Sequence, residues 1–286
     1  MTHRPFSRHY TVQGVEVPAF FYGTAWKEER TRELTTLALA AGFRAIDTAN
    51  QRKHYHEAGV GAALAAAREA GGPAREELFL QTKFTYREGQ DERLPFDPRA
   101  AYRDQVRQSF DVSLEHLGVE RIDSLLLHGP RTRHGLSEGD REVWRAMEEL
   151  VREGRVGLIG VSNVTAEQVE LLAGLAEVPP AFVQNRCFAR LGWDREVRRA
   201  CAEHGIVYQG FSLLTANRAE LVSPTLRRIG YRHRRTVPQV VFRAMLQLGM
   251  ICLTGTTDPE HMREDLEVYD FELSPEEVAA VEGVSG

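Results

Sequence analysis

Several side chains that can carry a proton lie close together in the segment AIDTANQRKHYHEAGVG, residues 45–61. Two are acids, two are imidazoles and one is a phenol: Asp47, Glu57, His54, His56 and Tyr55. A side chain that exchanges a proton in a reaction must be held within hydrogen-bond reach of the reacting atom. The segment therefore predicts a proton-handling site, and it leaves open which ring carries the proton.

Eight short apolar runs recur along the chain and indicate the elements that would position such a site. They occupy residues 18–24, 44–49, 78–84, 123–129, 157–163, 181–185, 206–212 and 250–255. Continuous apolar runs of this length are typical of strands that are covered on both faces, as in parallel sheets. Amphipathic helical windows separate the runs. This repeat predicts an α/β fold, a (β/α)8 TIM barrel, as a single domain over residues 1–286.

An open doubly wound sheet is the alternative, but no glycine-rich dinucleotide loop follows any of the runs. The opening HYTVQGVEVPAF, residues 9–20, predicts a β-hairpin with Gly14 in its turn. We expect this hairpin to close the bottom of the barrel. Helix-start signals, with a capping side chain before proline or before a partner three residues on, stand at Asp97–Pro98, Thr165–Gln168, Asp258–Pro259 and Ser274–Glu277.

Polar side chains stand at or just after the carboxyl ends of the predicted strands. They are Asp47, Lys83, His128, Ser162, Asn163, Gln184, Asn185 and Ser212. The carboxyl-terminal face of a (β/α)8 barrel carries the active site, because loops converge there on a rigid scaffold. The chain has lysine only at positions 27, 53 and 83, so a lysine inside a strand is conspicuous. An acid, a lysine and a histidine from three strands predict one catalytic site.

Composition argues against several classes of function. The formal net charge is -5, and no basic stripe is available to neutralise nucleic-acid phosphates. The densest basic cluster, YRHRRT at 231–236, is interpreted as a solvated face. Cys187, Cys201 and Cys252 lack metal-ligand spacing and predict reduced thiols. With neither a secretory signal nor a long apolar run, we expect a cytoplasmic protein without a metal site and without nucleic-acid or membrane partners.

A series of short motifs resembles the aldo-keto reductase superfamily in order and spacing. The motifs are GT at 23–24, IDTA at 46–49, TKF at 82–84, LLLHGP at 125–130, GRVGLIGVSN at 154–163, VQN at 183–185 and FELSPEE at 271–277. The resemblance implies a (β/α)8 barrel that binds an extended nicotinamide cofactor, NADPH or possibly NADH, and reduces an aldehyde or ketone. The implied partner is a small carbonyl compound; the oligomeric state is not readable from the sequence.

The resemblance also implies the catalytic roles. Tyr55 would give the proton to the carbonyl oxygen. An ordinary tyrosine, with a pKa of about 10, is a poor acid near neutrality. Lys83 would lower that pKa, and Asp47 would hold the lysine charged and in place. His128 would orient the carbonyl oxygen and donate a hydrogen bond to it.

Further positions match the cofactor contacts of the family. Ser162, Asn163 and Gln184 would bind the carboxamide of the nicotinamide, and Phe211 would stack on its ring. Ser212 and Leu214 would line the pyrophosphate path, with Gly23 and Thr24 beneath the cofactor. The complete implied cofactor set is Gly23, Thr24, Asp47, Ser162, Asn163, Gln184, Phe211, Ser212, Leu214, Thr256, Thr257, His261 and Asp265.

The opening segment departs from the family pattern. The family's tyrosine usually stands five residues after the aspartate and three before a glutamate, whereas those positions here hold Arg52 and His54. Tyr55 is one place later. One residue of offset rotates a side chain by about 100° in a helix, but a loop fixes no such penalty. Tyr55 in a lengthened loop, or His54 in its place, therefore remain alternative proton donors.

A second departure follows the last strand. Family members often have lysine–serine there, and then an arginine, to bind the 2′-phosphate of NADPH. This chain has Gly255, Thr256 and His261, and it has Asp265 where asparagine is common. Thr256, Thr257 and the backbone at the start of the next helix could still bind a phosphate. We expect NADPH, with NADH as the alternative.

Two other functions stay open at this level. A cofactor-binding sensor or regulatory subunit with little turnover would explain the altered tyrosine spacing. A hydrolytic or lyase barrel would use Asp47 and Glu57 as paired acids and would be indifferent to nicotinamide cofactors.

Overall fold

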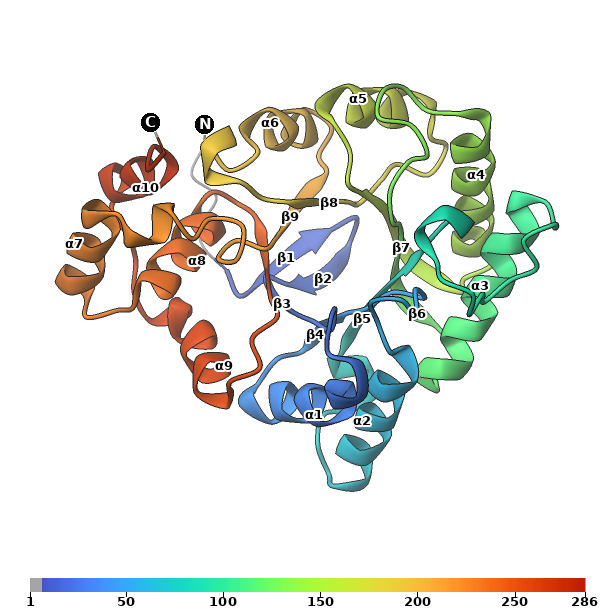
Figure 1. Cartoon of the computed structure of the whole chain (residues 1–286), viewed down its shortest axis with the longest axis horizontal. Coiled ribbons are helices and arrows are strands. Elements are labelled where there is room, and N and C mark those ends of the chain that lie inside the picture. The colour runs from blue at the N-terminus through green and yellow to red at the C-terminus, as the bar shows by residue number, and fades with distance from the viewer. Residues whose placement is uncertain (1–6, 286) are drawn as a thin grey trace.

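The computed structural model describes residues 7–285, and this part of the chain holds a closed barrel of parallel strands (Figure 1). Adjacent strands of the barrel follow the order β10-β3-β4-β5-β6-β7-β8-β9, and β9 pairs with β10. The strands are β3 (Phe20–Gly23), β4 (Ala45–Asp47), β5 (Phe79–Phe84), β6 (Ile122–Leu127), β7 (Val156–Ser162), β8 (Phe182–Arg186), β9 (Val207–Phe211) and β10 (Ile251–Thr254). Each lies within or overlaps one of the eight predicted runs, so the (β/α)8 prediction is confirmed.

Helices surround the barrel and cover the outer face of its strands (Figure 1). They are α1 (Thr31–Ala41), α2 (Glu57–Glu69), α3 (Tyr102–Leu117), α4 (Glu138–Arg152), α5 (Ala166–Leu175), α6 (Arg195–Glu203), α7 (Pro224–His233), α8 (Val237–Gln247), α9 (Pro259–Leu266) and α10 (Pro275–Glu282). Two of them, α7 and α10, pack on α8 and on each other. Figure 1 shows both at the outer edge, beside the C-terminus.

Three of the four predicted helix starts are confirmed. The side chains of Thr165, Asp258 and Ser274 accept hydrogen bonds from backbone N–H groups in the first turns of α5, α9 and α10. These bonds satisfy amide groups that have no partner inside the helix.

The fourth prediction, a helix starting at Asp97–Pro98, is wrong. The Asp97 carboxylate accepts from the N–H of Arg99, and the Asp97 carbonyl accepts from Ala100, so the segment closes a turn. Ala101 is then extended, with φ -58° and ψ 151°, and α3 begins only at Tyr102. Aspartate before proline serves a turn as well as a cap, and the extended residue decides between them here.

The interior of the barrel becomes more polar toward the carboxyl ends of its strands. On β5, Phe79, Gln81 and Lys83 point inward at successive levels, because alternate residues of a strand share a face. The ring of Phe79 lies 5.5 Å from that of Phe21 and 6.2 Å from that of Phe182, measured between centroids. An apolar layer thus fills the lower barrel and leaves polar layers above it, beneath the expected active face.

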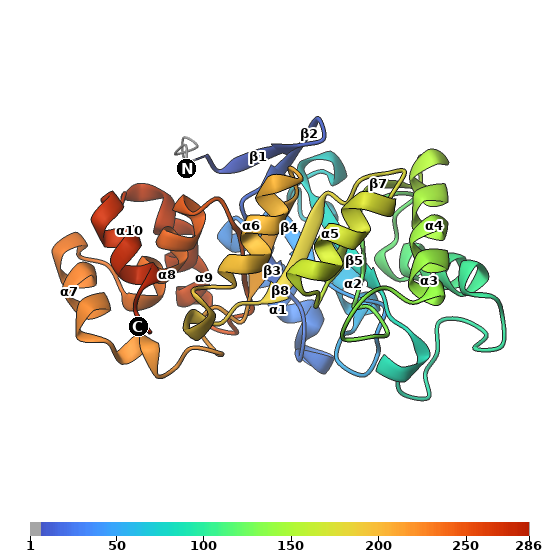
Figure 2. The ribbon, with the colours of Figure 1, turned by 90° about the horizontal axis from the view of Figure 1, so that it is seen from above.

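The predicted hairpin is present and closes the lower end of the barrel. Strands β1 (His9–Val12) and β2 (Val15–Pro18) pair antiparallel. Gln13 and Gly14 connect them with φ of 49° and 83°, the two positive values of a tight hairpin turn. Side chains of the hairpin donate to the carbonyls of Met250 and Pro179, which precede β10 and β8. Figure 2 shows the hairpin lying across one end of the barrel.

The contact between α2 and α3 requires glycine at position 61. A Cβ atom there would stand 2.0 Å from the carbonyl oxygen of His116. We expect Gly61→Ala to lower the free energy of unfolding by roughly 1–3 kcal/mol or more, as overpacking does. Chemical denaturation would measure the change.

Gly174, on α5, is the matched control. It is exposed, its φ is ordinary and no atom lies within 4 Å of an added Cβ. Gly174→Ala should raise the free energy of unfolding by about 0.5–1 kcal/mol, because alanine restricts the unfolded chain and favours the helix. If both variants shift stability in the same direction, the close approach of α2 to α3 is wrong.

Candidate active site

An aspartate–lysine pair lies at the carboxyl ends of β4 and β5. Lys83 Nζ donates to both carboxylate oxygens of Asp47 at 2.7 Å and to the carbonyl of Thr48 at 2.8 Å. Lys83 is 1% exposed and Asp47 is 3% exposed. Burial lowers the pKa of Lys83, and the charge of Asp47 opposes that shift. The three acceptors hold the ammonium in one position.

Glutamines from β5 and from β8, which is not adjacent to β4 in the barrel, also hold Asp47. Gln81 and Gln184 each donate from Nε2 to Asp47 Oδ1, at 2.8 and 2.9 Å. Both also donate to the side-chain oxygen of Gln209. Gln81 in turn accepts from Ser124 at 2.9 Å. This network orients the carboxylate before any ligand binds.

Sequence reasoning missed Gln81, Gln209 and Ser124. A signal was present, because each is a polar residue inside an otherwise apolar run. Gln81 also stands two residues before Lys83, and this spacing puts both side chains on the inner face of one strand.

Tyr55 lies beside this pair. Its ring centroid is 5.3 Å from Lys83 Nζ and 5.9 Å from the ring centroid of His128. The residue belongs to the loop between β4 and α2, so the helical penalty for its offset does not apply. Burial, with a smaller contribution from the charge of Asp47, raises the pKa of Tyr55 above its ordinary value. This shift in the pKa of Tyr55 is opposite to the lowering that the resemblance implied for Lys83, because the charge of Lys83 is already paired with Asp47. The raised pKa keeps the phenol protonated.

Long-range hydrogen bonds fix the loop that carries Tyr55. Asn50 Nδ2 donates to the carbonyl of Ser109 at 2.7 Å, and Gln51 Nε2 donates to that of Gly89 at 2.7 Å. The Tyr55 N–H then donates to the carbonyl of Gln51 at 2.9 Å. The loop is therefore held by segments that follow β5, not by its own sequence alone.

His54 is turned toward the mouth of the site. Its Nδ1 is 2.9 Å from the side-chain oxygen of Gln51, and its ring centroid is 3.9 Å from that of Trp26, which is 68% exposed. Within residues 7–285 it has no hydrogen bond with Asp47 or Lys83. Burial, then the charge of Lys53, lower the pKa of His54. Tyr55, rather than His54, stands beside both Lys83 and His128.

His128 follows β6 and is held by Thr85. Its Nδ1 lies 2.6 Å from the hydroxyl oxygen of Thr85, the second residue after Lys83. Burial, with smaller contributions from Lys83 and His54, lowers the pKa of His128 to about 3. The ring is neutral at pH 7. A Thr85 hydroxyl that donates to Nδ1 leaves the ring proton on Nε2.

Glu57, the other acid of the opening segment, faces away from Asp47. It accepts from the hydroxyl of Thr82 and, at 3.1 Å, from that of Ser113, and lies 3.3 Å from His116 Nδ1. Thr82 and Lys83 point to opposite faces of β5. The interpretation of Asp47 and Glu57 as paired catalytic acids is therefore wrong.

The predicted carboxamide-binding residues lie together at the ends of β7 and β8. Ser162 Oγ donates to the carbonyl of Gln184 at 2.6 Å, and Asn163 Nδ2 donates to that of His128 at 2.7 Å. Among the hydrogen bonds of the described chain, none uses the side-chain oxygen of Asn163 or of Gln184. Both oxygens can accept from an amide NH2 group.

Three predicted residues follow at the end of β9. Phe211 is half-buried, with the Arg186 guanidinium 5.8 Å from its ring centroid. Ser212 has a positive φ of 56°, and Leu214 packs against the core.

Three more predicted residues, Gly23, Thr24 and Thr256, lie where β3 meets β10. The N–H and hydroxyl of Thr24 both donate to the carbonyl of Asp47, at 2.9 and 3.0 Å. Gly23 lies against β10, where an added Cβ would stand 3.3 Å from the carbonyl oxygen of Thr254. Thr256 is half-buried.

The predicted residues after Thr256 differ in exposure. Thr257 and His261 are exposed, whereas Asp265 is buried. Burial raises the pKa of Asp265 to about 7, against opposing effects of Thr254 and His261.

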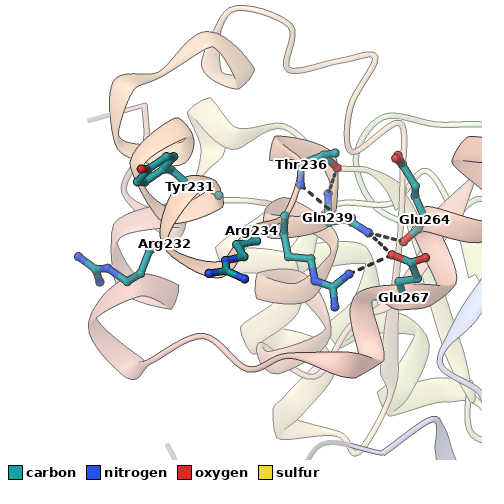
Figure 3. A pocket seen from close by; sticks show the side chains of 9 residues that line it. Tyr231, Arg232, Arg234, Thr236, Gln239, Glu264 and Glu267 are labelled. Carbon is teal, nitrogen blue, oxygen red and sulfur yellow. Dashed lines mark hydrogen bonds and ion pairs between the residues drawn. The ribbon is translucent and has the colours of Figure 1, made fainter.

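Residues of the basic cluster at 231–236 line a separate open pocket (Figure 3). Arg235 pairs with Glu267 at 2.9 Å, and Gln239 Nε2 donates to the Glu264 carbonyl at 2.9 Å. Tyr231 and Arg234 are exposed. The cluster is thus a solvated rim between α7, α8 and α9, as its composition predicts. Among residues 7–285, no helix is long and apolar enough to span a membrane.

Comparison with known proteins gives a consistent result. The sequence model of the Aldo/keto reductase family matches residues 20–285. "Uncharacterized oxidoreductase YtbE" of Bacillus subtilis is 32% identical over 95% of this chain and 90% of its own length. "Glyoxal reductase" of the same organism is 31% identical, with the same coverage.

Solved structures agree in fold. An aldo/keto reductase from Brucella melitensis superposes with a TM-score of 0.82 and 28% identity, over 96% of this chain and 98% of its own. A Bombyx mori aldo-keto reductase in complex with NADP has a TM-score of 0.81 and 25% identity, over 98% and 94%.

Proposed function

The chain belongs to the aldo/keto reductase family of oxidoreductases, and we propose that it reduces an aldehyde or ketone to an alcohol with NADPH. The observation that carries the proposal is the convergence of Asp47 on β4, Lys83 on β5, His128 just after β6 and Tyr55 in the loop after β4. The Bombyx mori structure in complex with NADP supports the choice of cofactor.

The four side chains divide the proton chemistry among them. A reduced nicotinamide, when bound, supplies the hydride. Neutral His128 donates from Nε2 to the carbonyl oxygen as negative charge develops there. Protonated Tyr55 transfers its phenolic proton to that oxygen, and the Lys83 ammonium stabilises the phenolate that forms. Asp47 keeps the ammonium in place.

The residues present fit a nicotinamide. The side-chain oxygens of Asn163 and Gln184 would accept from the carboxamide, and the half-buried ring of Phe211 offers a flat surface for stacking. Phosphates need positive charge, and the segment after β10 has no lysine or arginine before Arg263. Exposed Thr257 and the start of α9 supply neutral donors only.

Single-turnover oxidation of NADPH with a panel of carbonyl compounds tests the function. The panel includes glyoxal, because a relative is named for it, and a reactive aromatic aldehyde. We expect at least one substrate to be reduced. Tight NADPH binding without hydride transfer to any of them would instead support a sensor; the position of Tyr55 beside Lys83 weakens the reason for that alternative.

Thr85 is expected to set the tautomer of His128. Thr85→Val removes the hydroxyl from Nδ1 and should lower kcat/KM about three- to tenfold, the usual worth of one hydrogen bond. Nitrogen-15 NMR of the His128 ring would report the accompanying shift in tautomer. Thr85→Ser keeps the hydroxyl and should restore both values. Unchanged ring signals in Thr85→Val would contradict this role.

A further inference from the structure

Lys27 is a buried cation without an anionic partner. It lies in the loop after β3 and is 8% exposed. Its Nζ donates to the carbonyl of Gly255, the first residue after β10. Within residues 7–285 it forms no ion pair with a carboxylate. Burial, with a smaller effect of Arg30, lowers its pKa to about 8.

The acids that follow Lys27 in sequence do not pair with it within the described chain. Glu28, its direct neighbour, is exposed and forms no ion pair with Lys27. Glu29 pairs with Arg52 at 3.3 Å, and Glu33 pairs with Arg30 at 3.1 Å. Removing an ammonium from water is unfavourable unless an opposite charge faces it. An anionic ligand at Nζ would supply that charge.

The loop that Lys27 contacts begins with glycine and offers neutral donors. Gly255 has no side chain to cover the ammonium: a Cβ atom there would stand 3.6 Å from Nζ. Neither the N–H nor the hydroxyl of Thr257 takes part in a hydrogen bond within the described chain. Helix α9 begins two residues later, and the N-terminus of a helix favours negative charge.

We propose that Lys27 binds the 2′-phosphate of NADPH and thereby sets the preference for NADPH over NADH. The inference rests on the proposed function, which places a nicotinamide ring at Lys83, Tyr55 and His128. Lys27 contacts Gly255 in the loop between β10 and α9. This loop leads outward from the barrel to α9 (Figure 1). A phosphate at the adenosine end of an extended cofactor would reach that loop. The charge missing from the segment after β10 thus comes from the loop after β3.

Binding measurements on Lys27→Met test this role without relying on turnover. Dissociation constants would be determined by calorimetry for NADPH, NADH, adenosine 2′,5′-bisphosphate and adenosine 5′-monophosphate. We expect about tenfold or greater weakening for the two ligands with a 2′-phosphate, the size of one charge-assisted contact. The two ligands without it should change less than about twofold, since they lack the partner of Lys27.

Two further variants and a stability measurement complete the experiment. Lys27→Arg keeps the charge and should retain most of the preference. Lys53→Met, which removes an exposed lysine, should change none of the four constants. The unfolding temperature of ligand-free Lys27→Met should be unchanged or higher, because an unpaired buried charge is lost.

Three results would overturn the inference. Equal weakening of NADPH and NADH would place Lys27 at the pyrophosphate or in a structural role. Unchanged NADPH binding would show that Lys27 contacts no phosphate. Failure of the wild type to bind either dinucleotide would refute the proposed function, and this inference with it; the first two results leave the proposed function intact.

Discussion

Tyr55→Phe is expected to bind NADPH as tightly as the wild type and to lose a hundredfold or more of its rate of carbonyl reduction. The variant keeps the ring beside Lys83 and removes only the hydroxyl. General acid catalysis contributes roughly a hundredfold to ten-thousandfold in such reactions. Stopped-flow oxidation of bound NADPH by a reactive aromatic aldehyde would measure the rate. Fluorescence titration would confirm that the cofactor still binds.

His54→Asn is the matched control for Tyr55→Phe. His54 lies in the same loop, but its ring lies against that of Trp26 and its Nδ1 faces Gln51. We expect the rate of this variant to stay within several-fold of the wild type. A large loss in His54→Asn together with an unchanged rate in Tyr55→Phe would transfer the role of proton donor to His54.

Lys83→Met is expected to abolish measurable reduction and to destabilise the protein. The substitution keeps the length of the side chain but leaves the Asp47 carboxylate buried without its cation. Removing one member of a buried ion pair costs about 3–5 kcal/mol. Chemical denaturation would measure the free energy of unfolding, and single-turnover kinetics would measure the rate.

A double variant separates the two effects. Asp47→Asn combined with Lys83→Met removes both charges, and the asparagine oxygen can still accept from Gln81 and Gln184. We expect the double variant to recover most of the stability and none of the activity. If instead the single Lys83→Met variant reduces carbonyl compounds at the wild-type rate, Lys83 does not assist the proton donor.

The architecture follows from local patterns in the sequence. Strands buried on both faces need continuous apolar runs, and helices over them need an amphipathic period; both are local patterns. The hairpin turn at Gly14 and the caps at Thr165, Asp258 and Ser274 are also local, and all are confirmed. The exception, Asp97, failed because the conformation of Ala101 decided between a turn and a helix start.

The candidate site was predictable where it lies on strands. Alternation along β5 and adjacency of β4 and β5 bring Lys83 to Asp47. The glutamine network beneath them follows from the same rule, but it depends on which strands face each other across the barrel. Closure of the barrel decides that pairing.

Which of the two rings lies beside both Lys83 and His128 follows only from the fold of the loop, which places Tyr55 there. A loop has no fixed period, so one residue of offset says nothing about direction. The anchors of this loop are the carbonyls of Ser109 and Gly89, far along the chain from Asn50 and Gln51.

The position of Lys27 has the same origin. No spacing in the sequence relates it to Gly255, 228 residues away. Parallel pairing of β3 with β10 closes the barrel and brings the two loops together. Contacts of this kind form only when the barrel closes. The strands and helices that make closure possible are specified by local sequence patterns.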